Sequence, residues 1–183
     1  MRKIIFGVGI SIDGYIARAD GSVDFLFMPK DFSMAPFFKA IDTAIMGRKT
    51  LDVSLKMGGG SFGASMKTYV YTRTVPAGER DGMIFTQEPP SKLVTTLRKA
   101  QGKDIWLMGG GELAREFLKE DLVDEVHLGV VPVLLGEGIP AFATGFTQLD
   151  FKLTESKTYL RGLVSLKYER KRVRVRGVRS RPS

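Results

Sequence analysis

Two short apolar segments, each followed by glycine and a helix-forming stretch, constrain the fold of this chain most. The first reads Asp42-Thr-Ala-Ile-Met-Gly-Arg-Lys-Thr50 and the second reads Ile105-Trp-Leu-Met-Gly-Gly-Gly-Glu-Leu113. Glycine lets a ligand approach the backbone, and a helix N-terminus offers unpaired N–H groups and the positive end of the helix dipole. Two such turns in one small domain predict a site for a ligand with several phosphates, such as a dinucleotide.

Strand and helix signals alternate over the first two thirds of the chain. Apolar segments predict strands at residues 3–10, 43–46, 67–72, 83–86 and 104–108. Helical spacing of apolar residues predicts helices at residues 34–41 and 48–55, between Pro90 and Gly102, and around residues 113–118. The remaining stretches at 11–32 and 57–66 are expected to be loops, the second of them rich in glycine.

The hydrophobic pattern changes in the last third of the chain. Apolar and polar residues alternate at 126–130 and again at 164–169. Together with residues 150–158, these segments predict half-exposed antiparallel strands that form a β meander. The whole pattern predicts an α/β domain with a mixed sheet, parallel in its middle and antiparallel at one end.

The positive charge is concentrated at the C-terminus. The formal net charge of the 183 residues is +8, and residues 170–183 hold seven cationic and no acidic side chains. We therefore predict one nearly neutral domain over residues 1–170 and a basic, disordered tail over 171–183. A weak contact of the tail with RNA or an anionic surface is the alternative, and nucleic acid is not expected as the main partner.

Composition also limits which kinds of reactive or metal-binding site the chain can form. The chain has no cysteine and one histidine, His127, so disulfides, thiolate nucleophiles and a protein metal site are not expected. His127 alternates with apolar neighbours and is predicted on the solvent side of a strand. No apolar run reaches the ~18–20 residues that span a bilayer, and the N-terminal segment favours a first strand over a signal peptide. These features predict a cytoplasmic protein without membrane contact.

Two familiar phosphate-binding motifs do not fit. Residues 109–114 match the G-x-G-x-x-A form of the dinucleotide fingerprint, but the acid expected about 20 residues later is absent. That next strand ends at Val130-Val131-Pro132, whereas Asp124 and Glu125 lie at its beginning. The glycine-rich stretch near residue 60 lacks the Gly-Lys-Ser/Thr of a P-loop. The three glycines at 109–111 either form a tight turn or leave room for a ligand, and a ligand better explains why all three lack a β-carbon.

Cations and hydroxyls follow two of the predicted strands. Arg48, Lys49 and Thr50 begin a helix, where cations oppose the helix dipole, so a bound anion explains them better than solvent exposure does. Thr72 and Arg73 follow another strand and by themselves indicate only a turn. Combined with the first group, they predict a site for the 2′-phosphate that distinguishes NADP from NAD.

Candidate catalytic and substrate-side residues are fewer. Asp13 lies at the carboxyl end of the first strand, where it either forms an Asp-Gly turn or binds the substrate or orients a proton donor. Glu137, in Leu-Gly-Glu-Gly, is a second candidate whose alternative is a solvated loop acid. Phe25, Phe27 and Phe38 either wall a pocket or belong to the core.

The ordered motifs resemble those of the dihydrofolate reductase superfamily. The resemblance covers residues 2–170 and includes Ser11-Ile-Asp-Gly-Tyr-Ile-Ala17, Ile45-Met-Gly-Arg-Lys-Thr50, Leu107-Met-Gly-Gly-Gly-Glu-Leu113 and Asp124-Glu-Val-His-Leu128. The segment Pro132-Val-Leu-Leu-Gly-Glu-Gly-Ile-Pro140 makes the chain more similar to the RibD C-terminal domain of riboflavin biosynthesis. The resemblance implies a three-layer α/β fold with a central, mostly parallel sheet, an antiparallel C-terminal edge, and helices on both faces.

The resemblance also implies where NADPH binds. Gly47, Arg48, Lys49 and Thr50 are expected on its pyrophosphate side, with Thr72 and Arg73 near the 2′-phosphate. Gly109 and Gly110 are expected to form a cis peptide beside the nicotinamide, and Ala17 to line the nicotinamide pocket. The rest of the second turn is expected to complete the cofactor site through Met108, Gly111, Glu112 and Leu113.

The implied activity is reduction of a small heterocyclic substrate by NADPH. The reference substrate of the branch is 5-amino-6-(5-phosphoribosylamino)uracil, and a homodimer is expected. A dihydrofolate or pterin reductase is one alternative, although residues 32–39 lack the acid that folate reductases place on their first helix. A nucleotide- or RNA-binding module without redox activity is the other. The zinc deaminase that is often fused to the riboflavin reductase is excluded, because its Cys and His ligands are missing.

Overall fold

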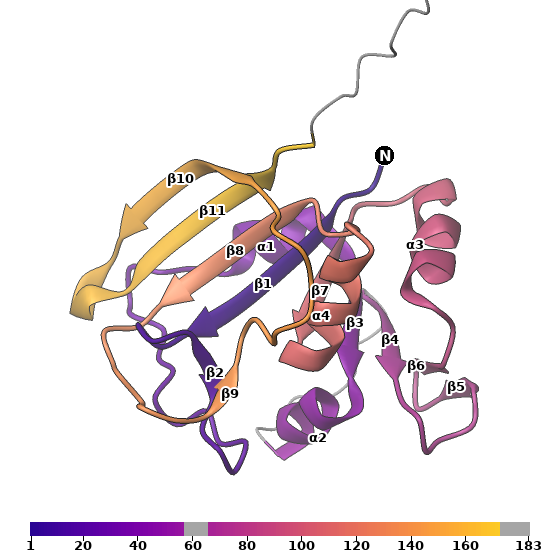
Figure 1. Cartoon of the computed structure of the whole chain (residues 1–183), viewed down its shortest axis with the longest axis horizontal. Helices are drawn as coiled ribbons and strands as arrows, with labels where there is room; N and C mark the ends of the chain where they lie inside the picture. The colour runs from indigo at the N-terminus through magenta and orange to yellow at the C-terminus, as the bar shows by residue number, and fades with distance from the viewer. Residues whose placement is uncertain (57–65, 173–183) are drawn as a thin grey trace, which may run out of the picture.

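A single nine-stranded sheet forms the centre of the molecule in the computed structural model, which describes residues 1–56 and 66–172. The strand order across this sheet is β10-β11-β8-β1-β7-β3-β4-β6-β5, as Figure 1 shows. The mixed sheet confirms the predicted α/β class. The predicted glycine-rich loop at 57–66 lies, apart from Met66, outside the described residues.

Six neighbouring strands of the sheet run parallel. They are β8 (Glu125–Val130), β1 (Ile4–Ile10), β7 (Asp104–Gly109), β3 (Ile41–Gly47), β4 (Lys67–Tyr71) and β6 (Met83–Thr86). Antiparallel strands flank them: β11 (Val164–Arg170) and β10 (Phe151–Thr158) on one side, and β5 (Gly78–Arg80) on the other. The carboxyl ends of the six parallel strands therefore meet at one edge of the sheet.

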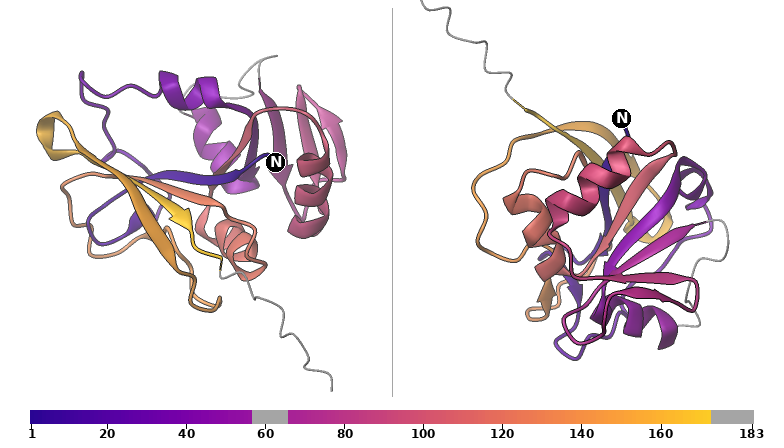
Figure 2. Two further views of the ribbon diagram at one scale, coloured as in Figure 1. Left: turned by 90° about the horizontal axis from the view of Figure 1, so that it is seen from above. Right: turned by 90° about the vertical axis from the view of Figure 1, so that its right-hand side faces the viewer.

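Helices cover both faces of the sheet (Figure 2). On one face lie α3 (Pro90–Lys99) and α4 (Gly111–Lys119), whose apolar residues pack with those of β1 and β7. On the other face lie α1 (Ala35–Ala40) and α2 (Arg48–Lys56). The three-layer arrangement that the resemblance implied is thus present.

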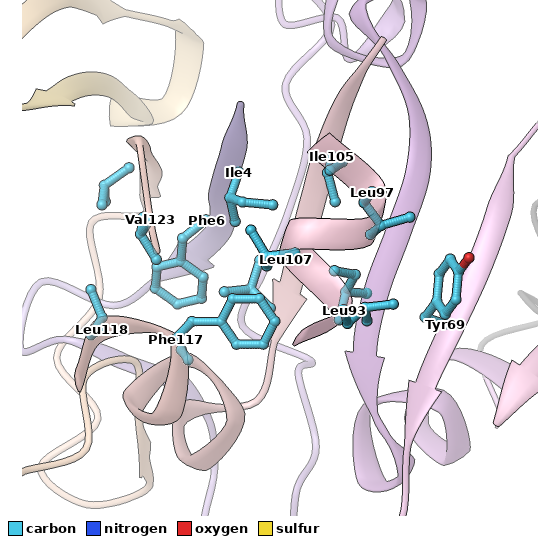
Figure 3. Close-up of a cluster of buried hydrophobic side chains, with 14 residues drawn as sticks. Ile4, Phe6, Tyr69, Leu93, Leu97, Ile105, Leu107, Phe117, Leu118 and Val123 are labelled. Atoms are coloured by element: carbon cyan, nitrogen blue, oxygen red, sulfur yellow. The ribbon is translucent and has the colours of Figure 1, made fainter. Parts of the chain in front are cut away.

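The main core lies between the sheet and the pair α3 and α4. Figure 3 shows Phe6 of β1, Leu107 of β7 and Phe117 of α4 close together in this cluster, and all three are fully buried. Burying a side chain of this size contributes about 1.5–3 kcal/mol each. The alternating residues of β1 divide between two layers, because Ile4 and Phe6 enter this core whereas Ile5 packs with α1 on the opposite face.

The C-terminal strands correct one prediction. We expected a meander of consecutive antiparallel strands, but β11 pairs with β8, and β10 lies outside β11 at the edge of the sheet. In addition, β8 is parallel to β1 and antiparallel only to β11. Alternation of polar and apolar residues reports which strands are half-exposed, but it does not encode their order or direction.

Short strands were missed within stretches that were expected to be irregular. Strand β2 (Tyr15–Ala17) pairs with β9 (Ile139–Pro140) in a separate two-stranded sheet. Strand β5, at the edge of the large sheet, consists of three exposed residues. Elements of two or three residues cannot show a hydrophobic period, so sequence patterns give no signal for them.

Asp124 ties four parts of the fold together at the amino ends of the strands. Its Oδ2 atom accepts hydrogen bonds from the backbone N–H of Ile4 at 2.8 Å and from Arg98 of α3 at 2.5 Å. Its Oδ1 atom accepts a bond from Arg172 at 2.6 Å, and Arg172 also pairs with Asp121. Residues 171 and 172, predicted as the start of the tail, are therefore held against the domain, and residues 173–183 lie outside the described residues.

None of the helices in the described ranges is both long enough and apolar enough to cross a membrane.

Removing the Asp124 carboxylate should strongly destabilise the domain. Asp124→Ala leaves the Ile4 N–H group without a partner and the largely buried Arg98 without its carboxylate, which predicts a loss of about 3–5 kcal/mol in the free energy of unfolding. Urea unfolding followed by circular dichroism measures it. The control Asp150→Ala, at an exposed acid bonded to Gln148, should cost under about 0.5 kcal/mol. Equal losses in both variants would contradict the role given to Asp124.

Candidate functional site

Three turns at the carboxyl edge of the parallel strands line one cavity of about 2390 Å³. The first turn joins β3 to α2 at Gly47–Thr50, the second follows β4 at Thr72–Thr74, and the third joins β7 to α4 at Gly110–Leu113. Two helices of nine residues thus begin at the cavity wall. Their N-terminal N–H groups and dipoles favour an anion there.

A hydrogen bond joins the first and third turns. The backbone N–H of Gly110 donates to the hydroxyl Oγ1 of Thr50 at 3.0 Å, across a sequence separation of 60 residues. This bond fixes the start of α2 relative to the start of α4. The peptide bond between Gly109 and Gly110 is cis, as the resemblance implied.

The glycines of these turns serve different purposes. Gly109 has a φ of +105°, which side chains rarely adopt, and a β-carbon on Gly111 would lie 2.3 Å from the carbonyl oxygen of Pro140. At Gly47, by contrast, a β-carbon would meet nothing within 4 Å. We expected a ligand to explain all three glycines at 109–111, but the fold itself requires Gly109 and Gly111. Open backbone that a ligand can approach lies at Gly47.

The cations of the site differ in whether they are already paired. Arg48 donates from Nε to Asp52 at 2.9 Å across one turn of α2, and both side chains are exposed. Within residues 1–56 and 66–172, Lys49 and Arg73 have no hydrogen-bond or ion-pair partner, and both line the cavity. The hydroxyl of Thr72 accepts bonds from the N–H groups of Thr74 and Val75, so it shapes the turn that carries Arg73.

Nearly all of the predicted cofactor residues meet in this cavity. Those that line it are Ala17, Gly47, Arg48, Lys49, Thr50, Thr72, Arg73, Met108, Gly110, Gly111, Glu112 and Leu113. Gly109 is not among the lining residues. Glu112 is exposed and pairs with Arg115 one turn later in α4. The assignment of these residues to a cofactor stays a prediction, which their common location supports.

Asp13 and Glu137 are not among the described residues that line the cavity. The two carboxylate oxygens of Asp13 accept hydrogen bonds from the backbone N–H groups of Leu135 and Gly136, the shortest at 2.7 Å. The Ser11 side chain first, and these N–H groups after it, lower the pKa of the Asp13 carboxyl. An acid that is stabilised in its ionised form is a poor proton donor. The geometry favours the turn-forming alternative for Asp13.

Another part of the cavity lining is aromatic. Phe37 of α1 lies edge-on to Trp106 of β7 with ring centroids 5.4 Å apart, and Phe38 lies 5.8 Å from the same indole. Phe27 also lines the cavity, which is the pocket-wall alternative that the sequence left open. Phe25 is instead buried in a small cluster with Val131 and Leu163. The predicted pocket wall is therefore formed by Phe27 and Phe38 and not by Phe25.

His127 was predicted on the solvent side of its strand, and the structure confirms the face but not the exposure. Its side chain is 18% exposed, lines the cavity and lies 5.9 Å from the Phe37 ring. Its Nε2 atom bonds Glu125 at 2.8 Å. The hydrogen bond from His127 outweighs burial and, together with Lys3, lowers the pKa of Glu125 to about 2. The alternation pattern placed His127 on the correct face of β8, but helix α1 covers part of that face.

Sequence reasoning missed the aromatic wall of Phe37 and Trp106. The signal was present, because Trp106 alternates with the core residues Ile105 and Leu107 along β7 and must therefore face the opposite layer. Within the described ranges, no group of three or more His, Cys, Asp or Glu side chains is arranged to hold a metal ion.

Sequence comparison finds relatives over nearly the whole chain. The sequence model of the RibD C-terminal domain family matches residues 2–165. The protein YyaP of Bacillus subtilis (strain 168), named as uncharacterized, is 34% identical over 179 residues, which cover 91% of this chain and 94% of YyaP.

Solved structures share the fold. The crystal structure of a putative riboflavin biosynthesis protein from Shewanella sp. PV-4 is similar with a TM-score of 0.79 and 30% identity, over 94% of this chain and 100% of that one. The dihydrofolate reductase of Enterococcus faecalis, complexed with NADP(H), is similar with a TM-score of 0.67 and 15% identity, over 93% of this chain and 97% of that one.

Two glycine substitutions should separate the packing role from the open position. Gly111→Ala forces a β-carbon against the Pro140 carbonyl and should cost at least about 1–3 kcal/mol of unfolding free energy. Gly47→Ala enters open space and should leave stability unchanged or raise it by up to about 1 kcal/mol. Urea unfolding of the two variants measures the difference, and similar losses in both would refute the distinction.

Acid should weaken the domain partly through Glu125. A pKa that is lowered on folding stabilises the folded state above the ordinary pKa near 4.5, and that stabilisation is lost as pH falls toward 2. Glu125→Gln should therefore cost about 1–2 kcal/mol at pH 7, after allowing for solvent screening, nearly as much at pH 5, and clearly less at pH 3. Urea unfolding at the three pH values measures this. Glu169→Gln, on the neighbouring strand, is the control, and a constant cost for Glu125→Gln at every pH would contradict the assignment.

Proposed function

This chain belongs to the RibD C-terminal domain family, and on that premise we propose that it is an NADPH-dependent reductase of a small heterocyclic substrate. The observation that carries the proposal is the convergence of the three turns on one cavity, where the N–H of Gly110 donates a hydrogen bond to Thr50. A ligand with one phosphate needs only one such turn. Two helix N-termini, together with Arg73, which has no partner among the described residues, suit a ligand with phosphates at several positions.

The residues present fit NADPH. Gly47 leaves the backbone open beside the N-termini of α2 and α4, where the pyrophosphate would bind. Arg73 and Lys49 have no partner in the described chain; Lys49 would face the pyrophosphate, and Arg73 would hold the 2′-phosphate, a group that NADH lacks. Ala17 and Gly110 also line the cavity, and the nicotinamide would bind beside them.

When bound, the cofactor supplies a hydride. The contribution of this chain is to hold the donor and acceptor carbons at about 3–3.5 Å from each other and to exclude water from the reacting pair. The aromatic wall of Phe37 and Trp106 offers a flat acceptor an apolar surface on the same cavity. We propose reduction of a C=N or carbonyl centre in such an acceptor.

The acceptor that we favour resembles 5-amino-6-(5-phosphoribosylamino)uracil. The putative riboflavin biosynthesis protein from Shewanella, at 30% identity, supports this class of substrate. A folate or pterin reductase is less well supported, because helix α1 presents Phe37 and Phe38 to the cavity and carries no acid in its first turn. The proposal includes a homodimer, which analytical ultracentrifugation would test.

NADPH should raise the melting temperature of the protein far more than NADH does, because a ligand stabilises the folded state in proportion to how tightly it binds that state.

Arg73→Ala should weaken NADPH binding by about 1.5–3 kcal/mol, the scale of a charged hydrogen bond, and leave NADH binding unchanged. Isothermal titration calorimetry measures both affinities. The control Arg80→Ala removes an arginine of β5 that does not line the cavity and should bind NADPH like the original chain.

Two results would overturn this assignment. Equal and negligible shifts of the melting temperature with NADPH and NADH would refute the cofactor. Equal weakening of NADPH and NADH by Arg73→Ala would remove the arginine from the 2′-phosphate site.

A further inference from the structure

The single histidine of the chain lies in the cavity wall without a role in the proposed cofactor site. His127 of β8 pairs in register with Gly7 of β1, which has no side chain on the cavity face. The ring of Phe37 lies over this position, 5.9 Å from the imidazole, and a β-carbon on Gly7 would lie 3.4 Å from the Phe37 ring. His127 is thus a polar group at the edge of an aromatic wall.

Glu125 fixes the orientation of the imidazole. One carboxylate oxygen accepts a bond from Lys3 Nζ at 2.6 Å, and the other bonds His127 Nε2 at 2.8 Å. Because an ionised carboxylate only accepts hydrogen bonds, Nε2 carries the proton. The second ring nitrogen, Nδ1, has no hydrogen-bond partner within the described residues.

The charged groups around His127 are already paired with one another. Lys167 of β11, opposite His127 in register, pairs with Glu155 of β10 at 2.9 Å. Lys3 lies between Glu125 and Glu169, at 2.6 Å and 3.8 Å. Neither neighbouring strand therefore offers Nδ1 a free charged partner in the described part of the chain.

We propose that Nδ1 of His127 binds the polar edge of the acceptor, a ring amide in which a carbonyl group and an N–H group are adjacent. This inference rests on the proposed function and names the chemical group that the site recognises. Nδ1 accepts a hydrogen bond when the imidazole is neutral and donates one when it is protonated. A ring amide offers Nδ1 a hydrogen-bond partner in both states, because its N–H group donates and its carbonyl group accepts. An isolated carbonyl or amine offers a partner in only one state.

The position of His127 makes it a binding residue and not a proton donor to the reacting bond. It precedes Gly129 of the same strand by two residues, which is about 7 Å along β8. Gly129 pairs with Gly9 close to the carboxyl edge, and the cofactor turns leave the sheet at that edge. His127 therefore contacts the acceptor on the side away from the nicotinamide, and it selects the heterocycle by its amide edge.

Lumazine (pteridine-2,4-dione), a flat ring with amide edges, is the probe that tests this inference. Trp106 is the one tryptophan of the chain and lines the same cavity, so quenching of its fluorescence reports binding. We expect lumazine to quench Trp106 and His127→Phe to weaken lumazine binding by about tenfold or more. His127→Gln, which keeps an amide hydrogen-bonding group, should retain part of the affinity. NADPH affinity, measured by calorimetry, should be unchanged in both variants.

The single histidine also gives a direct spectroscopic readout. Its imidazole Cε1–H resonance should shift when lumazine is added and should stay in place when 1,3-dimethyllumazine, whose ring N–H groups are methylated, is added at the same concentration. Glu125→Gln should weaken lumazine binding because the ring loses its orientation, and Glu169→Gln on the neighbouring strand should not.

The outcomes separate this inference from the proposed function. An unmoved histidine resonance, absence of lumazine binding, or equal lumazine affinity in the original chain and in His127→Phe would each overturn the role of His127 while NADPH still binds. Absence of NADPH binding would instead refute the proposed function. If His127→Phe does not fold, as judged by its melting transition, the comparison of His127→Gln with the original chain decides the question.

Discussion

The parallel pairing of six neighbouring strands is the constraint on which the rest of the structure depends. Parallel strands need crossover connections, and the helices of these connections cover both faces of the sheet, so both faces must be apolar. The same direction of travel brings all the carboxyl ends to one edge. Turns that are far apart in sequence, at Gly47, Thr72 and Gly110, therefore line one cavity. At the opposite edge, Asp124 joins the amino end of β1 to α3 and to the last described residues.

The glycines of the turns differ in whether the fold itself requires them. Gly109 and Gly111 meet requirements of the backbone and of packing against Pro140, whereas Gly47 leaves open space beside two helix N-termini. A glycine-rich sequence motif is thus only partly a binding motif. The cations differ in whether they already have an ion-pair partner. Arg48 pairs with Asp52, whereas Arg73 has no partner in the described residues. The proposed affinity for the phosphates of NADPH depends on the open and unpaired members of each group.

Much of the architecture could be predicted from the sequence, because long apolar segments and helical spacing follow directly from burial. Strand β1, helix α2 and strand β7 lie within a residue or two of their predicted bounds. The order of β10 and β11 could not be predicted, since alternation does not encode which strand pairs with which. In the site, the three turns could be found because glycine, cations and hydroxyls mark them. Alternation along the strands indicates which face His127 and Trp106 occupy, but their place in the cavity could not be predicted, because it depends on how α1 crosses the sheet.

A crystal structure of this chain grown with NADP⁺ would test the central claim most directly. The account predicts one cofactor along the carboxyl edge, with its pyrophosphate at the N-termini of α2 and α4, its 2′-phosphate at Arg73 and its nicotinamide beside Gly110 and Ala17. A cofactor bound elsewhere, or a cavity that stays empty at saturating NADP⁺, would contradict it.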